Sequence, residues 1–162
     1  MYHVASLPAV SDRIENLLPH ADPMLLLDRI IGANQDACLT ETVIGRRHAL
    51  FLRDDRTVSN TLLIELMAQT VGVTAGLRLK AQGEPPKVGF LLGSRHFACD
   101  GDCLNEGDLI RVHVKCLYFS DGELPSQFQC TAYRNDETEP VGTANLTVYQ
   151  PKDLSAWNNS AS

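Results

Sequence analysis

A long apolar segment in the middle of the chain limits its possible folds more than any other feature. Residues 61–77 are about as long as a membrane span, but they include Glu65 and Gln69. A charged and an amide side chain within such a segment favour a buried helix of a soluble domain over a membrane helix. The sequence therefore predicts a domain built around one enclosed helix, and no membrane segment.

Start and stop signals frame this helix in the sequence VSNTLLIELMAQTVGVTAGLRLKAQG. Ser59 or Asn60 is the expected N-cap, and Gly83 is the expected end. Because the helix is apolar almost all round, other elements must cover most of its sides. A second, short helix is expected from Ser11 to Leu18, where proline follows.

The other long segments predict β-strands. Along residues 109–119, Ile110, Val112 and Val114 alternate with Arg111 and other polar side chains, which indicates one buried and one solvated face. An antiparallel sheet that covers a single long helix explains both patterns, so the predicted class is α+β. The expected strands are 24–31 and 38–44, joined as a hairpin, and then 88–97, 109–119, 127–133 and 142–149.

Composition and charge narrow the classes of function. The chain has 162 residues and 44% hydrophobic content, which is enough for one domain, expected over residues 1–154, with 155–162 as a flexible tail. A net charge of −6 argues against nucleic acid as a partner. The N-terminus lacks the basic start and long apolar run of a secretory signal, so a cytoplasmic protein is expected.

The cysteines predict reduced thiols. The five of them form an odd set with no repeated pair spacing, as is usual for a cytosolic protein. A zinc site made of His96, Cys99, Cys103 and His113 is the alternative interpretation, but no second closely spaced pair completes it. We therefore expect no metal.

Glu65 is the most unusual residue of the predicted helix. A buried carboxylate without a partner is costly, so Glu65 is expected to be paired or partly protonated. A carboxylic acid kept protonated near neutral pH can act as a general acid. The free amides at the start of the helix, near Asn60 and Thr61, could hold the carbonyl oxygen of a thioester. The alternative is that Glu65 only binds a loop backbone.

Two histidines precede this helix. His20 lies between Pro19 and Pro23, which would hold its imidazole in a constrained turn, although it could equally serve only to fix that turn. His48 follows two arginines and is expected to be a solvated loop residue.

Two motifs carry a resemblance to a known family over residues 11–150. The segment LPHADPMLLLDRI resembles the opening of the bacterial β-hydroxyacyl-acyl-carrier-protein dehydratases, and ELMAQTVGV resembles the Glu-Ala-Met-Ala-Gln stretch of their central helix. The Glu-Gly-Asp turn at 106–108 adds to the match. More narrowly, PHADPMLLLDR, IELMAQTV and VGFLLGSRHF are similar to the accessory dehydratase-like proteins of aryl polyene pigment gene clusters.

The resemblance implies a hotdog fold, in which an antiparallel sheet wraps one long helix, and dehydration of 3-hydroxyacyl thioesters. The substrate would arrive on the phosphopantetheine arm of an acyl carrier protein, without another cofactor. The protein would form a homodimer, or a heterodimer with a related dehydratase. Glu65 matches the family's catalytic acid, and His20 is the best candidate for the base. The expected substrate contacts are Asn60, Thr61, Gly89, Phe90 and Leu91.

One departure from the family concerns its general base. The family places a catalytic histidine in a Gly-His-Phe-Pro loop fourteen residues before the glutamate, where this chain has Phe51 in HALFLRDDRTVSN. Three interpretations follow: His20 supplies the base, His48 reaches the site after a loop rearrangement, or a partner subunit contributes the histidine. Two other functions stay open, a hotdog thioesterase and a weakly catalytic or non-catalytic partner of an active dehydratase.

Docking of an acidic carrier protein would need basic residues near the mouth of the site. The candidates are Arg46, Arg47, Arg78, Lys80, Lys87 and Arg95. The alternative is that they are scattered solvated charges.

Overall fold

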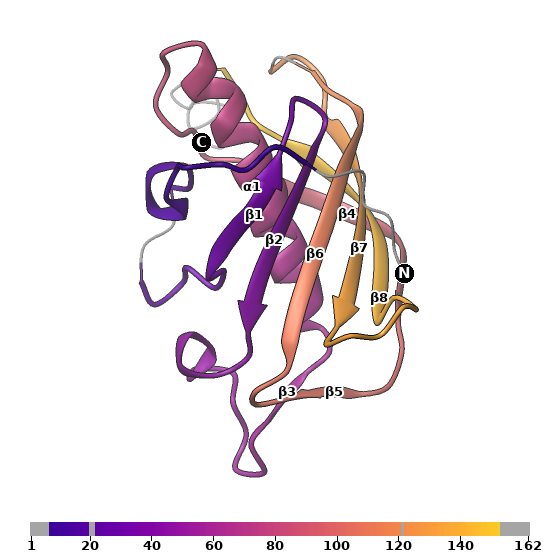
Figure 1. The fold of residues 1–162 in the computed structure, drawn as a ribbon. Coiled ribbons are helices and arrows are strands. Elements are labelled where there is room, and N and C mark those ends of the chain that lie inside the picture. Colours follow the sequence, from indigo (N-terminus) through magenta and orange to yellow (C-terminus); the bar gives the residue numbers. More distant parts are fainter. Residues whose placement is uncertain (1–6, 20–21, 121, 153–162) are drawn as a thin grey trace, which may run out of the picture.

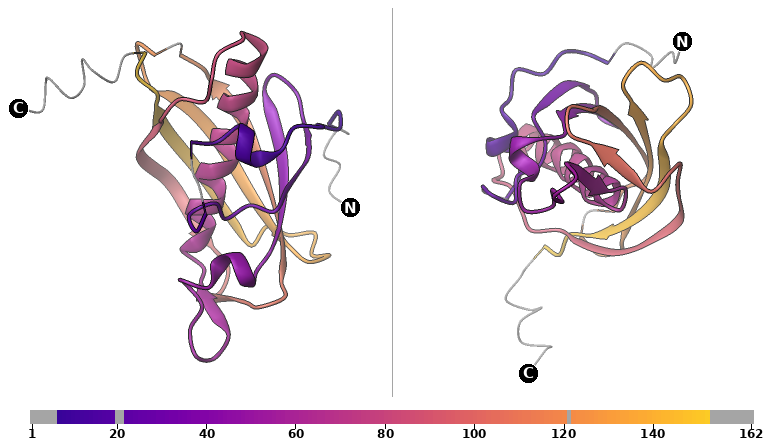
Figure 2. Two further views of the ribbon diagram at one scale, coloured as in Figure 1. Left: turned by 90° about the vertical axis from the view of Figure 1, so that its left-hand side faces the viewer. Right: turned by 90° about the horizontal axis from the view of Figure 1, so that it is seen from below.

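A computed structural model describes residues 7–19, 22–120 and 122–152. One six-stranded antiparallel sheet curves around one long helix, α1 (Figure 1). Seen along the helix, the strands surround α1 on most sides, and the N-terminal segment crosses its remaining side (Figure 2). This is the predicted α+β class, and the expected tail at 155–162 lies outside the described residues.

The strand order in the large sheet is β1-β2-β6-β7-β8-β4. β4 therefore forms one edge and pairs only with β8, while β1 forms the other edge. A second sheet of two short strands, β3 and β5, lies at the N-terminal end of α1. The bounds are β1 Arg29–Ala33, β2 Ala37–Val43, β3 Thr57–Ser59, β4 Phe90–Cys99, β5 Cys103–Asn105, β6 Leu109–Tyr118, β7 Ser126–Arg134 and β8 Gly142–Tyr149.

The alternation predicted along the sheet is confirmed. Ile110, Val112 and Val114 of β6 are buried, and the register places Val112 opposite Ala132 and Val114 opposite Cys130 of β7. These side chains share the face that covers α1 and form the core with it. The predicted hairpin is also present as β1 and β2, although its first strand begins five residues later than expected, at Arg29.

α1 spans Leu62–Ala81, so it starts later than a cap at Ser59 or Asn60 would have placed it. Ser59 belongs to β3, and the N-cap is Thr61, which makes no side-chain capping hydrogen bond. Pairing of residues 57–59 with β5 competes with helix extension and wins here. The C-terminal prediction holds, because Gly83 adopts a φ of +74° directly after the helix and its N–H binds the Lys80 carbonyl.

The short helix predicted over residues 11–18 is reduced to the 3₁₀ turn Ile14–Asn16. Its N-cap, Arg13, makes no capping bond, and one turn without a cap does not propagate. The packing of Leu17 and Leu18 against Gly76 and Gly72 of α1 fixes the segment instead. A second 3₁₀ turn covers Arg46–His48.

α1 is the only helix in the described part of the chain whose length and composition would suit a membrane span. Its most apolar window is 61% buried inside this domain. That burial is what the core helix of a hotdog domain requires. The helix is therefore accounted for by the domain core.

Candidate active site

Glu65 lies in the first turn of α1 with its side chain half-buried. It lines two cavities, which makes it the point where they meet. Cavity A, of about 240 Å³, follows α1 toward its C-terminal half, and cavity B, of about 320 Å³, lies beside the start of the helix. A carboxyl group at this junction can reach a molecule that passes from one cavity into the other.

Cavity A is mostly apolar and owes its space to small residues. Ala68, Gly72 and Ala75 present no large side chain on the helix side, and Phe119 and Phe128 line the cavity from other elements. Such a wall suits an acyl chain more than a polar ligand. The remaining lining residues are Leu17, Leu18, Pro19, Glu65, Gln69, Val71, Gly76, Lys87, Gly89, Leu91, Ser120, Ser126, Val148 and Gln150.

Gln69 holds the Glu65 carboxyl from one turn further along the helix. Its Nε2 donates to Glu65 Oε1 at 3.2 Å and to the Met24 carbonyl at 2.7 Å, and its Oε1 accepts from the Leu26 N–H at 2.9 Å. Gln69 is 1% exposed, and its bond to the Leu26 N–H is buried, whereas its bonds to Met24 and Glu65 are part-buried. Our sequence interpretation gave Gln69 no role, although its spacing of four residues from Glu65 was the available signal.

The predicted substrate contacts divide into two groups. Gly89 and Leu91 line cavity A, and Thr61 lines cavity B, so these three share a cavity with Glu65. Asn60 and Phe90 line neither cavity. The Asn60 amide instead donates to the Gly101 carbonyl, which ties the start of α1 to the turn before β5. Contact of these residues with substrate stays a prediction.

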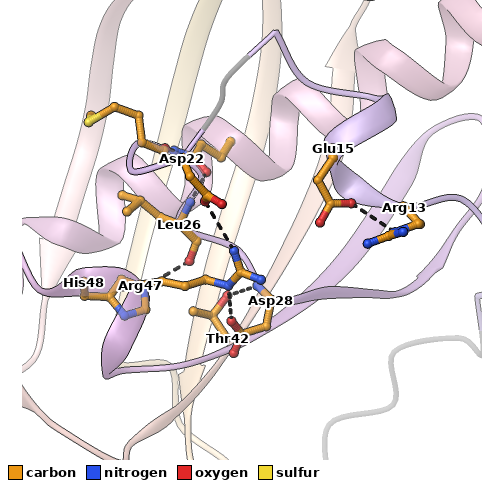
Figure 3. A network of polar contacts seen from close by, with 10 residues as sticks. Arg13, Glu15, Asp22, Leu26, Asp28, Thr42, Arg47 and His48 are labelled. Carbon is orange, nitrogen blue, oxygen red and sulfur yellow. Dashed lines mark hydrogen bonds and ion pairs between the residues drawn. The ribbon is translucent and has the colours of Figure 1, made fainter.

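His48 is not the solvated loop residue that its neighbours suggested. Its side chain is 0% exposed, its Nδ1 accepts from the Gly45 N–H at 3.0 Å, and its Nε2 lies 3.0 Å from the Leu26 carbonyl (Figure 3). Because Nδ1 is the acceptor, Nε2 carries the proton and donates to Leu26. Burial lowers the pKa of His48, which favours this neutral form. Both ring nitrogens are thus bonded in this conformation, so His48 would have to break these bonds to reach the site, and its role after a loop rearrangement stays a prediction.

Around His48, an ion-pair network joins the 22–28 segment to the loop after β2. Arg47 binds Asp28 at 2.8 Å and Asp22 at 3.7 Å, and Asp28 accepts from the Val43 N–H at 2.8 Å (Figure 3). These groups are partly exposed, so each pair contributes little stability by itself. Together they hold the segment that carries Met24 and Leu26 against the sheet.

His20, the predicted base, lies outside the described residues. The preceding residue, Pro19, lines cavity A. Phe51, at the position of the family's loop histidine, lines cavity B together with Glu65. The position of the family's loop histidine therefore lines the same cavity as Glu65, but the phenylalanine at this position has no group that can accept a proton.

Four of the six basic residues proposed for carrier docking are neutralised by acidic neighbours. The ion pairs join Arg47 to Asp28, Arg78 to Asp36, Lys80 to Asp12 and Lys87 to Glu84. This distribution favours scattered surface charges over one basic patch. Arg46 and Arg95 make no ion pair among those found in the described residues.

The zinc group considered from sequence does not gather in the described residues, and the cysteines are unpaired. No three His, Cys, Asp or Glu side chains gather there as a metal-binding group. All five cysteines are free thiols, and burial raises the pKa of Cys38 and of Cys130 to about 12. Those two thiols therefore stay protonated and unreactive at neutral pH.

A sheet wrapped around a helix, with one carboxyl group beside an apolar cavity, defines a hotdog protein of the thioester-processing class. A sequence profile of the ApeP-like family, described as ApeP dehydratase, matches residues 12–159. The chain belongs to this dehydratase family. Among curated proteins, none matches the sequence.

Solved structures share this fold. A chain of the dehydratase heterocomplex ApeI:P from Xenorhabdus doucetiae is 24% identical, with 92% of this chain and 97% of that chain covered and a TM-score of 0.83. Cj0977, a virulence protein from Campylobacter jejuni, is 10% identical over 87% and 98% of the two chains, with a TM-score of 0.64. A hypothetical thioesterase with coenzyme A from Streptococcus pneumoniae is 15% identical over 75% and 84%, with a TM-score of 0.55.

Proposed function

We propose that this protein dehydrates 3-hydroxyacyl thioesters carried by an acyl carrier protein, with Glu65 as the acid and a histidine of a related partner subunit as the base. The observation that carries the proposal is the composition of the junction between the cavities. Glu65 is present there, but no histidine lines either cavity among the described residues, and Phe51 stands at the position of the base. The acid therefore needs a base from elsewhere, and we propose that a partner subunit supplies it.

The reaction needs one proton removed and one delivered. The base takes a proton from the α-carbon, the electron pair forms the double bond to the β-carbon, and the β-hydroxyl leaves as water with the proton of the Glu65 carboxyl. The acyl chain would extend into apolar cavity A, and the carrier arm would enter through cavity B. Placed acid and base groups contribute about 10²- to 10⁴-fold each to such rates.

An exposed sheet edge supports a partner subunit. β4 is an edge strand, and its apolar residues Leu91 and Leu92 are 42% and 52% exposed. A free edge of this length favours pairing with a strand of another chain. Leu91 also lines cavity A, so a chain paired along β4 would lie next to the cavity. The similar chain from Xenorhabdus doucetiae comes from a dehydratase heterocomplex, which supports a heterodimer over a homodimer.

The family match supports a place in aryl polyene biosynthesis, and we propose that the protein acts in the cytoplasm. A dehydratase of that kind would act repeatedly on a growing acyl chain. No cofactor other than the carrier's phosphopantetheine arm is required by this chemistry.

His20 as the base is the second candidate. The observation in its favour is that Pro19, its neighbour in the chain, lines the same cavity as Glu65. In this case the single chain would contain a complete catalytic pair. The His20→Ala variant separates the two accounts, because it abolishes activity only if His20 is the base.

The test is to assay the purified chain alone and together with a related dehydratase that carries the loop histidine, on a 3-hydroxyacyl carrier protein. Mass spectrometry of the acyl group follows the loss of water. We expect weak activity of the single chain and a gain of about 10²-fold or more in the reconstituted pair. Equal rates per site in the two preparations would contradict the partner histidine. Release of free 3-hydroxy acid without an enoyl product would instead identify a thioesterase.

A further inference from the structure

A continuous line of hydrogen bonds runs from the buried histidine to the proposed acid. His48 Nε2 donates to the Leu26 carbonyl at 3.0 Å, and the Leu26 N–H donates to Gln69 Oε1 at 2.9 Å. Gln69 Nε2 then donates to Glu65 Oε1 at 3.2 Å. His48, Leu26 and Gln69 are 0–1% exposed, so water does not compete for the two bonds that join them, whereas the bond from Gln69 to Glu65 is part-buried. The line therefore connects a rigid interior group to the half-buried carboxyl.

Backbone groups fix the direction of each bond. The Gly45 N–H binds His48 Nδ1 at 3.0 Å and thereby leaves Nε2 as the donor. The Leu26 N–H demands an acceptor, so Gln69 must turn its oxygen toward Leu26 and its amide hydrogens toward Met24 and Glu65. A reversed amide would set donor against donor at Leu26. Displacement of the Leu26 peptide would thus move the donor that holds Glu65.

Besides the bond from His48, core packing and polar contacts hold the 25–28 segment, since Leu25, Leu26 and Leu27 are buried members of the hydrophobic core. The segment is otherwise held by Asp28, whose partners are Arg47, the Val43 N–H and the Thr42 hydroxyl. These contacts lie two residues beyond Leu26 and are part-buried or exposed. The side chain of Leu26 is held by the core, and its two backbone polar groups bind His48 on one side and Gln69 on the other.

We propose that His48 is a positioning residue for the reaction. It orients the Glu65 carboxyl through the backbone of Leu26 and the side chain of Gln69, without touching the substrate. The proposal rests on the dehydration reaction proposed above. It assigns a use to a buried histidine that is not free to serve as the base in this conformation, since both of its nitrogens are bonded. Misplacement of a catalytic group by about 1 Å can cost up to ~10²-fold in rate, which sets the scale of the effect.

Two matched variants separate positioning from a structural role. His48→Gln keeps a donor within reach of the Leu26 carbonyl and loses the acceptor for Gly45, whereas His48→Asn keeps that acceptor and loses the donor. Each variant loses one buried bond, so similar decreases in unfolding free energy are expected. If the line of bonds orients Glu65, kcat should fall about 10-fold in His48→Asn and stay near the wild-type value in His48→Gln, with KM little changed in both.

A double-mutant cycle tests the route. In the Gln69→Met background, His48→Asn should add no further loss of kcat, because the path to Glu65 is already broken. Losses that multiply would contradict transmission through Gln69. Equal kcat in His48→Gln and His48→Asn, per folded molecule, would reduce His48 to a structural residue.

A spectroscopic readout keeps the test independent of catalysis. The side-chain carboxyl ¹³C signal of Glu65, assigned by its absence from Glu65→Gln, reports the environment of that group in the full-length chain. It should shift in His48→Asn and stay in place in His48→Gln. An inactive wild type, alone and in the pair, would remove the proposed function but leave this measurement valid. A signal unmoved in both variants would overturn the positioning role.

Discussion

One side of α1 packs into the core and the other lines a cavity, although the side chains on both sides are mostly apolar. Toward the sheet, Leu63, Met67 and Thr70 are fully buried against strands. Toward cavity A, Ala68, Gly72 and Ala75 are half-buried and leave space. The difference lies in side-chain volume: large residues fill the core on one side, and small residues create a binding cavity on the other.

Polar groups follow the same division. On the sheet side, the Thr70 hydroxyl binds Thr40 of β2 and the Leu66 carbonyl, both at 2.8 Å, and so is satisfied internally. On the cavity side, the Glu65 carboxyl accepts one hydrogen bond from the described residues, that of Gln69, and lines open space. A group with unused hydrogen-bonding capacity beside a cavity is available for a ligand, and a group with all its capacity used in the core is not.

The largest effect is expected on the cavity side, in Glu65→Gln. The amide keeps the shape of the side chain but has no proton to transfer, so dehydration should fall by about 10²- to 10⁴-fold. Unfolding in denaturant should be almost unchanged, because Glu65 is only half-buried and Gln can still accept from Gln69. Turnover at the wild-type rate would exclude Glu65 as the acid.

The opposite behaviour is expected on the sheet side, in Leu63→Ala. Leu63 is 0% exposed, packs where a Cβ on Gly142 of β8 would come within 2.8 Å, and lines neither cavity. The free energy of unfolding should fall by about 2–5 kcal/mol. The rate per folded molecule should change little, as measured at a temperature where the variant remains folded. A large loss of rate with an unchanged free energy of unfolding would contradict the proposal that the sheet side of α1 serves stability and the cavity side serves function.

The two glycines of the cavity side offer a finer comparison. A Cβ at position 76 would lie 2.2 Å from the Leu17 carbonyl oxygen, whereas a Cβ at position 72 would meet only the end of the Leu18 side chain, at 2.6 Å. Gly-to-Ala in a helix gains about 1 kcal/mol, and overpacking costs about 1–3 kcal/mol. Thermal unfolding should show Gly72→Ala near neutral and Gly76→Ala destabilised, since backbone cannot move aside as a side chain can. The reverse order would mean that Leu17 is held less firmly than its contacts indicate.

The smallest effect concerns pH. Burial lowers the pKa of His48 and of His113 below their ordinary value of 6.5. The unfolded chain therefore takes up these protons at a higher pH than the folded chain does. Stability should be complete above the unfolded pKa and should decline as pH falls through it toward the lowered folded values. His48→Gln should flatten this slope in part, and His113 should account for the remainder. An unchanged slope would mean that His48 does not titrate on unfolding.

Glu65 and the helix around it could be predicted from sequence because their signals are local. An apolar segment of helical length with one carboxylate, and strands with alternating polarity, specify an enclosed helix under an antiparallel sheet. The departure at Phe51 was also visible, because its spacing to Glu65 is fixed by the chain. The structure adds that Phe51 and Glu65 share cavity B.

His48 and the start of α1 were beyond such signals. The two arginines before His48 suggested solvent, but the turn at Arg46–His48 directs the ring inward, where the Gly45 and Leu26 backbone groups bind it. Residues 57–59 have helix-compatible neighbours, but they pair with β5, which is more than forty residues away in the chain. In both cases, partners distant in sequence decide the conformation.

The sequence by itself determined the fold class and the family, and it singled out Glu65 as the candidate acid, because periodicity, composition and motif spacing are properties of neighbouring residues. Only the tertiary structure decided which polar groups meet. Residues 26, 48, 65 and 69 come from three separate segments, and they form one line of hydrogen bonds only after the sheet has closed around α1. Hydrogen bonds act over about 3 Å and have strict directions, so their partners depend on the packing of the whole chain.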